Sequence, residues 1–151
     1  MKKTNNKGFS LVELIIVIAI MAILIGVLAP QYIKYVERSR VSSDKDMIDS
    51  LTKAAQTATT DDDYFDGINN ADNITISKGA ITVSGTSLSG AVDEFYGSLA
   101  NNKGFKSKAF ASTTITVEVT EDTSNGNILK VVVKDNSSNA VNGLYDASKY
   151  K

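Results

Sequence analysis

An unbroken apolar run near the start of the chain limits what this sequence can fold into more than any other feature. From Phe9 to Ala29 the sequence has 21 residues and one charge, that of Glu13. A helix of this length spans about 31 Å at 1.5 Å per residue, close to the hydrocarbon thickness of a bilayer. The run therefore predicts a helix that crosses a membrane or becomes buried in a large apolar assembly.

A plain membrane anchor or a signal peptide accounts for only part of this pattern. Lys2, Lys3 and Lys7 precede the run and favour a cytoplasmic N-terminus. The apolar core is longer than that of a cleaved signal peptide, and Ala29-Pro30-Gln31 is a poor cleavage site. Neither reading explains Glu13, because a carboxylate inside a membrane helix costs on the order of a few kcal/mol and indicates a function.

Residues 7–14, Lys-Gly-Phe-Ser-Leu-Val-Glu-Leu, resemble the class III signal of type IV prepilins and pseudopilins. The resemblance implies that a prepilin peptidase cuts after Gly8 and methylates the new N-terminal residue, Phe9. It also implies that Glu13 guides the docking of subunits into a helical fibre. Pro30 matches a common pilin position where the helix kinks or melts. The resemblance is close over the first 30 residues and covers only the general layout of the rest.

Simple energetic arguments agree with the roles that the resemblance implies for Glu13 and Pro30. A cleaved Phe9 amine on a neighbouring chain, 4 Å from Glu13, would attract it by about 4 kcal/mol at an effective dielectric near 20, before desolvation removes much of the gain. The pair is therefore expected to fix register more than to add stability. Pro30 clashes with the carbonyl of Gly26, four residues earlier, and cannot donate a hydrogen bond to it. This predicts a kink or a melted stretch across Gly26–Pro30, more in a fibre than in a free subunit, with simple bending as the alternative.

The helical pattern continues from Gln31 as an amphipathic helix that ends near Ala58–Thr60. Charged residues occupy its other faces. Glu37, Arg38 and Arg40 are equally consistent with pairing across subunits and with simple solvation. The apolar stripe consists of Ile33, Val36, Val41, Ile48, Leu51, Ala55 and Ala58, with Met47 and Ala54 beside it.

The remainder is predicted to be a β-rich head. A clean alternation over Thr113–Thr120, followed by Asn127–Lys134, predicts a β-hairpin whose apolar face lies on the helix stripe from Ile48 to Ala58. The other predicted elements are the strands Ile74–Ser77 and Ala80–Val83 with a Lys78-Gly79 turn, and a short helix over Gly90–Ala100 with Ser89 as its N-cap. The fold class is therefore α+β, with one long N-terminal helix packed on a small antiparallel sheet of about four strands.

Two loops carry residues with a conceivable binding role. The acidic residues of Asp61–Asn73 do not have the spacing of a calcium loop, so a solvated loop is favoured and no metal site is predicted. The segment Lys103–Phe110 interleaves basic and aromatic residues, as in some proteins that bind nucleic acid. A loop whose aromatic residues pack inward is favoured, and nucleic acid is not expected as a partner.

Composition excludes several kinds of chemistry. The chain has no cysteine and no histidine, so it has no disulfide and no thiol or imidazole catalysis. No carboxylate pair stands out by spacing, and neither a catalytic residue nor a cofactor is predicted. Loss of the leader leaves 13 of the 16 basic residues against 17 acidic ones. A mildly acidic chain of this kind is not a general binder of nucleic acid or anionic membranes.

These features predict a non-enzymatic structural subunit with four parts: a cleaved leader (1–8), a membrane or fibre-core half-helix (9–29), an amphipathic half-helix (30–60) and a head (61–151). The resemblance implies a single-pass protein of the cytoplasmic membrane that enters a cell-surface pilus for adhesion, motility or aggregation. The implied partners are further copies of the chain, the prepilin peptidase–methyltransferase, and an inner-membrane assembly platform with its ATPase. The alternatives are a minor pilin, a pseudopilin of a type II secretion or DNA-uptake system, and a membrane-tethered surface binding domain.

Overall fold

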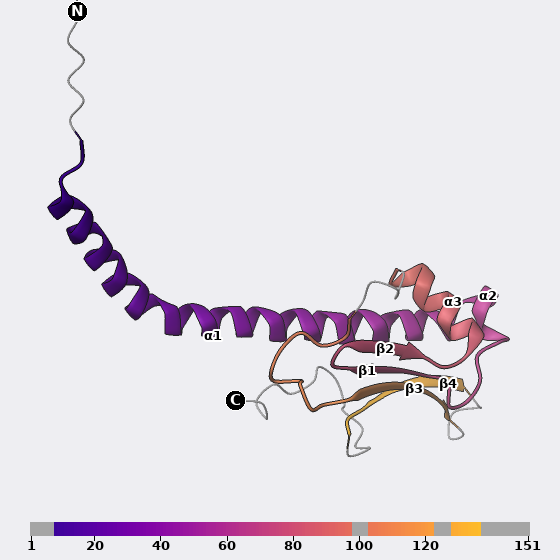
Figure 1. The fold of residues 1–151 in the computed structure, drawn as a ribbon. Coiled ribbons are helices and arrows are strands. Elements are labelled where there is room, and N and C mark those ends of the chain that lie inside the picture. The colour runs from indigo at the N-terminus through magenta and orange to yellow at the C-terminus, as the bar shows by residue number, and fades with distance from the viewer. Residues whose placement is uncertain (1–7, 98–102, 123–127, 137–151) are drawn as a thin grey trace, which may run out of the picture. The chain divides into compact units, whose positions relative to one another are not determined.

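A computed structural model describes residues 8–97, 103–122 and 128–136 of the chain. The chain divides into two units, residues 1–36 and 37–151, and the long helix contributes to both. Figure 1 shows the elements in order along the chain. They are α1 (Leu11–Ala58), α2 (Asp62–Phe65), β1 (Asn73–Ser77), β2 (Ala80–Val83), α3 (Thr86–Phe95), β3 (Ile115–Asp122) and β4 (Ile128–Lys134).

Helix α1 is uninterrupted over its 48 residues, with Pro30 inside it. Residues 26–30 are helical in the isolated chain, so melting of Gly26–Pro30 in a fibre stays a prediction. Within the part of the chain that the structure describes, α1 is the one helix long and apolar enough to cross a membrane. The predicted helix end near Ala58 is confirmed.

The head contains one four-stranded antiparallel sheet with the strand order β2-β1-β3-β4. Strands β1 and β2 form a tight hairpin, with Ser77 paired with Ala80 across Lys78 and Gly79. Gly79 has φ +89°, a left-handed backbone conformation that glycine adopts without steric penalty. The predicted α+β fold with about four antiparallel strands is therefore confirmed, whereas the loop between β3 and β4 lies outside the described residues.

The core of the head forms between the second half of α1 and one face of the sheet. Ile74 and Ile76 of β1 and the alternate residues of β3 are fully buried, as is Leu51 of α1. The predicted contact between the last hairpin and the helix stripe is confirmed, because these residues share one apolar cluster. Its α1 members are Met47, Ile48, Leu51, Ala54, Ala55 and Ala58.

The short helix of the head differs from the prediction. Helix α3 begins at Thr86 after Gly85, four residues before the expected start at Gly90, and its last residue is Phe95. The Ser- and Thr-rich sequence before Gly90 is typical of a loop, but Leu88 lies three residues before the buried Ala91 and completes an apolar face that the core covers. The predicted N-cap Ser89 lies inside the helix, whose N-cap is Gly85. The expected extension to Ala100 is wrong at Tyr96 and Gly97, which are not helical, and residues 98–100 lie outside the described ones.

A second difference is α2, a one-turn helix within the predicted loop Asp61–Asn73. Asp61 caps it, because the Asp61 Oδ1 atom accepts a hydrogen bond from the Asp63 N–H at 3.0 Å. An aspartate before a short acidic turn is a recognised N-cap signal. The pattern was present in the sequence, but the helix is too short to show a periodicity.

Candidate processing and assembly segment

The predicted cleavage site lies in open, non-helical backbone just before α1. Gly8 is exposed, and a Cβ atom at this position would meet nothing within 4 Å. The Phe9 side chain is 90% exposed. The peptide bond between Gly8 and Phe9 is therefore accessible to a peptidase in the isolated chain.

Glu13 contacts the backbone at the start of its own helix. The Ser10 N–H donates a hydrogen bond to the Glu13 Oε2 atom at 3.1 Å, and the Leu14 N–H donates to the Ser10 carbonyl at 3.2 Å. Ser10 and Glu13 have the spacing of a capping box, in which the residue at N3 binds the N-cap N–H. The sequence contains this Ser-x-x-Glu signal, but sequence reasoning assigned Glu13 only an intermolecular role. An amine from a neighbouring chain would have to share the carboxylate with this N–H.

The apolar surface that follows Glu13 is uncovered in the isolated chain. Every large apolar side chain from Leu14 to Leu28 is at least 50% exposed. At about 25 cal/mol per Å² of apolar surface removed from water, such a helix strongly favours lipid or other helices over solvent. It has the length and exposure required of a membrane anchor or a fibre core.

In the head, two carboxylates of α1 hold a loop of the chain against the helix. The Lys106 N–H donates to both oxygens of Asp44, at 3.0 and 3.2 Å, and the Ser107 N–H donates to the Asp44 Oδ2 atom at 2.9 Å. The next two N–H groups, of Lys108 and Ala109, donate to the Oε1 atom of Glu37, the second of them at 3.3 Å. Four consecutive backbone donors are therefore satisfied by two side chains placed two helical turns apart.

The residues of this loop divide between core and surface. Phe105 and Phe110 are 3% and 1% exposed, and their rings stack with centroids 4.8 Å apart. Lys106 and Lys108 are exposed. The aromatic residues therefore pack inward, which confirms the prediction for the Lys103–Phe110 segment.

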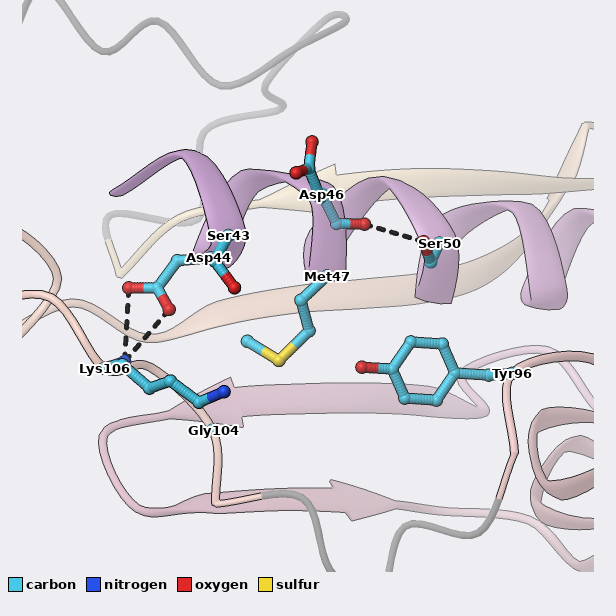
Figure 2. A pocket seen from close by; sticks show the side chains of 8 residues that line it. All are labelled: Ser43, Asp44, Asp46, Met47, Ser50, Tyr96, Gly104 and Lys106. Carbon is cyan, nitrogen blue, oxygen red and sulfur yellow. Dashed lines mark hydrogen bonds between the residues drawn. The ribbon is translucent and has the colours of Figure 1, made fainter. Parts of the chain in front are cut away.

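Figure 2 shows the small pocket beside this loop. Its volume is about 200 Å³. Asp44 and Met47 of α1 line it, together with Tyr96 and Lys106. Among the described residues, no cluster of three or more His, Cys, Asp or Glu side chains has the arrangement of a metal site.

The three predicted inter-subunit charges differ in their surroundings. Glu37 binds the loop as described and lies 3.9 Å from an Nη atom of Arg40. Arg38 and Arg40 are exposed. Pairing of these residues across subunits stays a prediction, and the role of Glu37 within its own chain was not visible from the sequence.

Tyr64 joins the two small helices of the head. Its hydroxyl group donates to the Glu94 Oε2 atom at 2.5 Å, and its ring meets Phe95 edge-to-face at 6.0 Å. The hydrogen bond to Glu94, helped by desolvation and by the nearby carboxylates, raises the pKa of Tyr64 to about 12. This contact fixes α2, which carries the acidic residues of the Asp61–Asp66 stretch, against α3.

A long exposed apolar helix followed by a small α+β head with a four-stranded antiparallel sheet is consistent with the fold of type IV pilins. The family description "Prokaryotic N-terminal methylation motif" matches residues 3–29. This segment therefore carries the N-terminal methylation motif, and the resemblance to type IV prepilins seen in the sequence is confirmed.

Individual relatives agree with this assignment over part of the chain. The type IV major fimbrial protein FimA of Dichelobacter nodosus is 52% identical over 40 residues, 26% of either chain. The type IV major pilin protein PilA of Myxococcus xanthus is 36% identical over 61 residues, 40% of this chain and 28% of the relative. The prepilin peptidase-dependent protein A of Clostridium perfringens is 30% identical over 86 residues, 57% of this chain and 61% of the relative.

The chain spans about a quarter of the length of the fimbrial relatives that it matches. No solved structure shows a significant match. The similarity therefore concerns the N-terminal helix most directly, and the head is known from its structure.

Proposed function

We propose that this chain is a structural subunit of a type IV pilus. The peptide bond after Gly8 is cut, the new N-terminal Phe9 is methylated, and processed chains polymerise through the helix of residues 9–29. The observation that carries the proposal is the methylation motif on a helix whose apolar surface is uncovered along its whole length. Burial of this surface between chains gives a large favourable free energy without any change in the head.

Glu13 sets the register of the growing fibre in this proposal. Its carboxylate pairs with the methylated amine of a neighbouring chain while it still accepts the Ser10 N–H. A buried charge without a partner is costly, so only the register that supplies the amine is tolerated. Pro30 lets the helix bend or melt across Gly26–Pro30 when neighbouring helices pack, and Arg38 and Arg40 pair with acids of other subunits.

The proposed partners follow from these steps of cleavage, methylation and polymerisation. A prepilin peptidase–methyltransferase processes the chain, and an inner-membrane platform with its ATPase adds it to the fibre. Before assembly the chain spans the cytoplasmic membrane once, with the N-terminus in the cytoplasm, as the lysines before the apolar run favour. A minor pilin or a pseudopilin would have the same N-terminus and fold, and abundance in long surface fibres separates the major subunit from both.

The test is intact-mass and N-terminal analysis of protein sheared from the surface of the native cells. A chain that begins at methylated Phe9 and dominates the sheared fraction is the expected result. The variant Glu13→Gln should still be cut but should disappear from the sheared fraction, whereas Asp46→Asn should assemble normally. A chain that begins at Met1 and remains in membranes would refute the proposal in favour of a tethered surface binding domain.

A further inference from the structure

The charges of the head are unevenly distributed along the axis of α1. Exposed basic residues gather around the first turns of α1 in this unit and the loop bound to them: Arg38, Arg40, Lys78, Lys103, Lys106 and Lys108. Lys78 belongs to this group because it forms an isolated bridge with Gly104, next to the loop. The carboxylates nearby are those of Glu37, Asp44 and Asp46, and the first two accept backbone N–H groups.

The opposite end of the head carries acidic residues. Four aspartates lie between residues 61 and 66, in and beside α2, and α3 adds Asp93 and Glu94. Figure 1 shows α2 and α3 together at the C-terminal end of α1. Exposed basic residues towards this end are fewer, namely Lys53 of α1 and Lys130 of β4, whereas Lys78 lies at the other end of β1. The two charged ends are about 21 Å apart, measured along α1 from Asp44 to Ala58.

The basic surface has a fixed shape because of how its loop is held. Phe105 and Phe110 bury their stacked rings in the core on either side of the exposed lysines. The four backbone N–H groups from Lys106 to Ala109 are bound to Asp44 and Glu37. The exposed residues Lys106 and Lys108 therefore lie on a backbone that is held in place, which lowers the entropy cost of binding.

We infer that the loop of residues 103–109 is the docking surface for the acidic α2 segment, residues 61–66, of a second copy of this chain. The inference rests on the proposed fibre function and specifies one contact within it. The basic and acidic surfaces lie towards different ends of the head, so the contact joins unlike patches. Such head-to-tail contacts generate open helical filaments when the rotation between subunits does not close into a ring, whereas contacts between like patches close into dimers.

The charge arrangement also gives the contact a selectivity that an apolar helix lacks. Complementary surfaces attract over about one Debye length, 8 Å at physiological ionic strength, and like surfaces repel. A chain that approaches in the wrong axial position would place lysines against lysines or aspartates against aspartates. The head contact thus supplements Glu13 in choosing the axial position of each added chain.

Disulfide trapping in the full chain tests this contact directly, because the protein contains no native cysteine. The double variant Asp62→Cys with Lys108→Cys should give a ladder of linked chains in oxidised fibres. Each single variant should give at most a dimer band. The matched control pair is Asp62→Cys with Thr82→Cys, since Thr82 is exposed on the edge strand β2 and lies at neither charged end. Fibres that form normally but give no ladder with Asp62 and Lys108 would overturn the inference.

Charge reversal provides the second measurement. Lys106→Glu with Lys108→Glu should lower the yield of sheared fibres about tenfold, which corresponds to about 1.4 kcal/mol, and Asp62→Lys with Asp63→Lys should do the same. The combined variant should recover most of the yield. If the combined variant is worse than either pair, the two surfaces do not meet and the inference fails.

The two proposals fail in distinguishable ways. Membrane fractions of every variant are analysed for a chain that begins at Phe9. A wild-type chain that stays uncut and forms no fibre contradicts the pilus function itself. Normal fibres from the lysine variant, combined with lost retention of DNA or another polyanion, would identify a polyanion as the occupant of the loop surface instead.

Discussion

Replacement of Asp44 by alanine should destabilise the head more than any other change of a charged residue on α1. Asp44 is 1% exposed and accepts hydrogen bonds from two backbone N–H groups, those of Lys106 and Ser107. A buried donor left without a partner costs about 1–3 kcal/mol, so leaving both N–H groups without their acceptor should cost about 2–6 kcal/mol. For a unit of this size, each kcal/mol corresponds to roughly 3–5 °C in Tm.

Two further substitutions grade the effect. Asp44→Asn keeps one acceptor oxygen and should lose about half as much stability. Glu37→Ala should cost about 1 kcal/mol or less, because its side chain is 27% exposed and water can replace it. Asp46→Ala is the matched control, since Asp46 is an exposed aspartate on the same helix.

The assay is urea unfolding of the full chain in detergent micelles, followed by near-ultraviolet circular dichroism, which reports on packed aromatic residues. Hydrogen exchange in peptides that cover residues 105–110 adds a local readout. In Asp44→Ala the amide hydrogens of Lys106 and Ser107 should exchange faster than in the unaltered protein, and their rates should rise more than those of the rest of the head. Equal stability of Asp44→Ala and Asp46→Ala would refute the role assigned to Asp44.

Three other predictions follow from single sites. Gly104→Ala should lower the free energy of unfolding by about 4 kcal/mol or more, measured by thermal unfolding, because the new Cβ atom would lie 2.0 Å from the Ser77 carbonyl oxygen. Gly79→Ala should cost only about 1 kcal/mol, because Gly79 has the same left-handed backbone but open space around the position of a Cβ atom. Equal losses would contradict the steric reason. Ser107→Ala should leave stability unchanged or raise it by up to about 1 kcal/mol, because the Ser107 Oγ atom is buried with no hydrogen-bond partner among the described residues; a clear loss would show that it has one. The pKa of Tyr64, raised to about 12 by its hydrogen bond to Glu94, lies above the ordinary 10.0. Its contribution to stability should be complete below pH 10 and disappear as pH rises through 12. The ultraviolet titration curve of Tyr64→Phe should lack the tyrosine that ionises near pH 12. An unchanged curve would refute the assignment of this raised pKa to Tyr64.

The sequence alone was sufficient for the features that depend on local pattern. The apolar run from Phe9 to Ala29 predicted α1 because its length and composition leave no other stable structure in lipid. Strict alternation predicted β3, and Lys78-Gly79 predicted the β1–β2 turn. The motif around Gly8 and Phe9 was recognisable because it is short and contiguous in sequence, and it lies within residues 3–29, which match the N-terminal methylation family.

Some local signals were present but were outweighed. Ser10 and Glu13 have capping-box spacing, yet the functional reading of Glu13 obscured its bond to the Ser10 N–H. The start of α3 at Thr86 was hidden because serine and threonine favour loops, while burial of Leu88 decided in favour of helix. In both cases the short-range preference was weak, and packing or a single hydrogen bond determined the result.

Only the tertiary structure revealed the contacts that organise the head surface. Asp44 and the Lys106 N–H are 62 residues apart in the chain, and Glu37 and the Lys108 N–H are 71 apart. The acceptors are ordinary surface-type residues in sequence, and the donors are backbone groups that every residue carries. No periodicity or motif encodes such a pairing, because it exists only after α1 and the loop have been brought together by burial of Phe105 and Phe110 in the core.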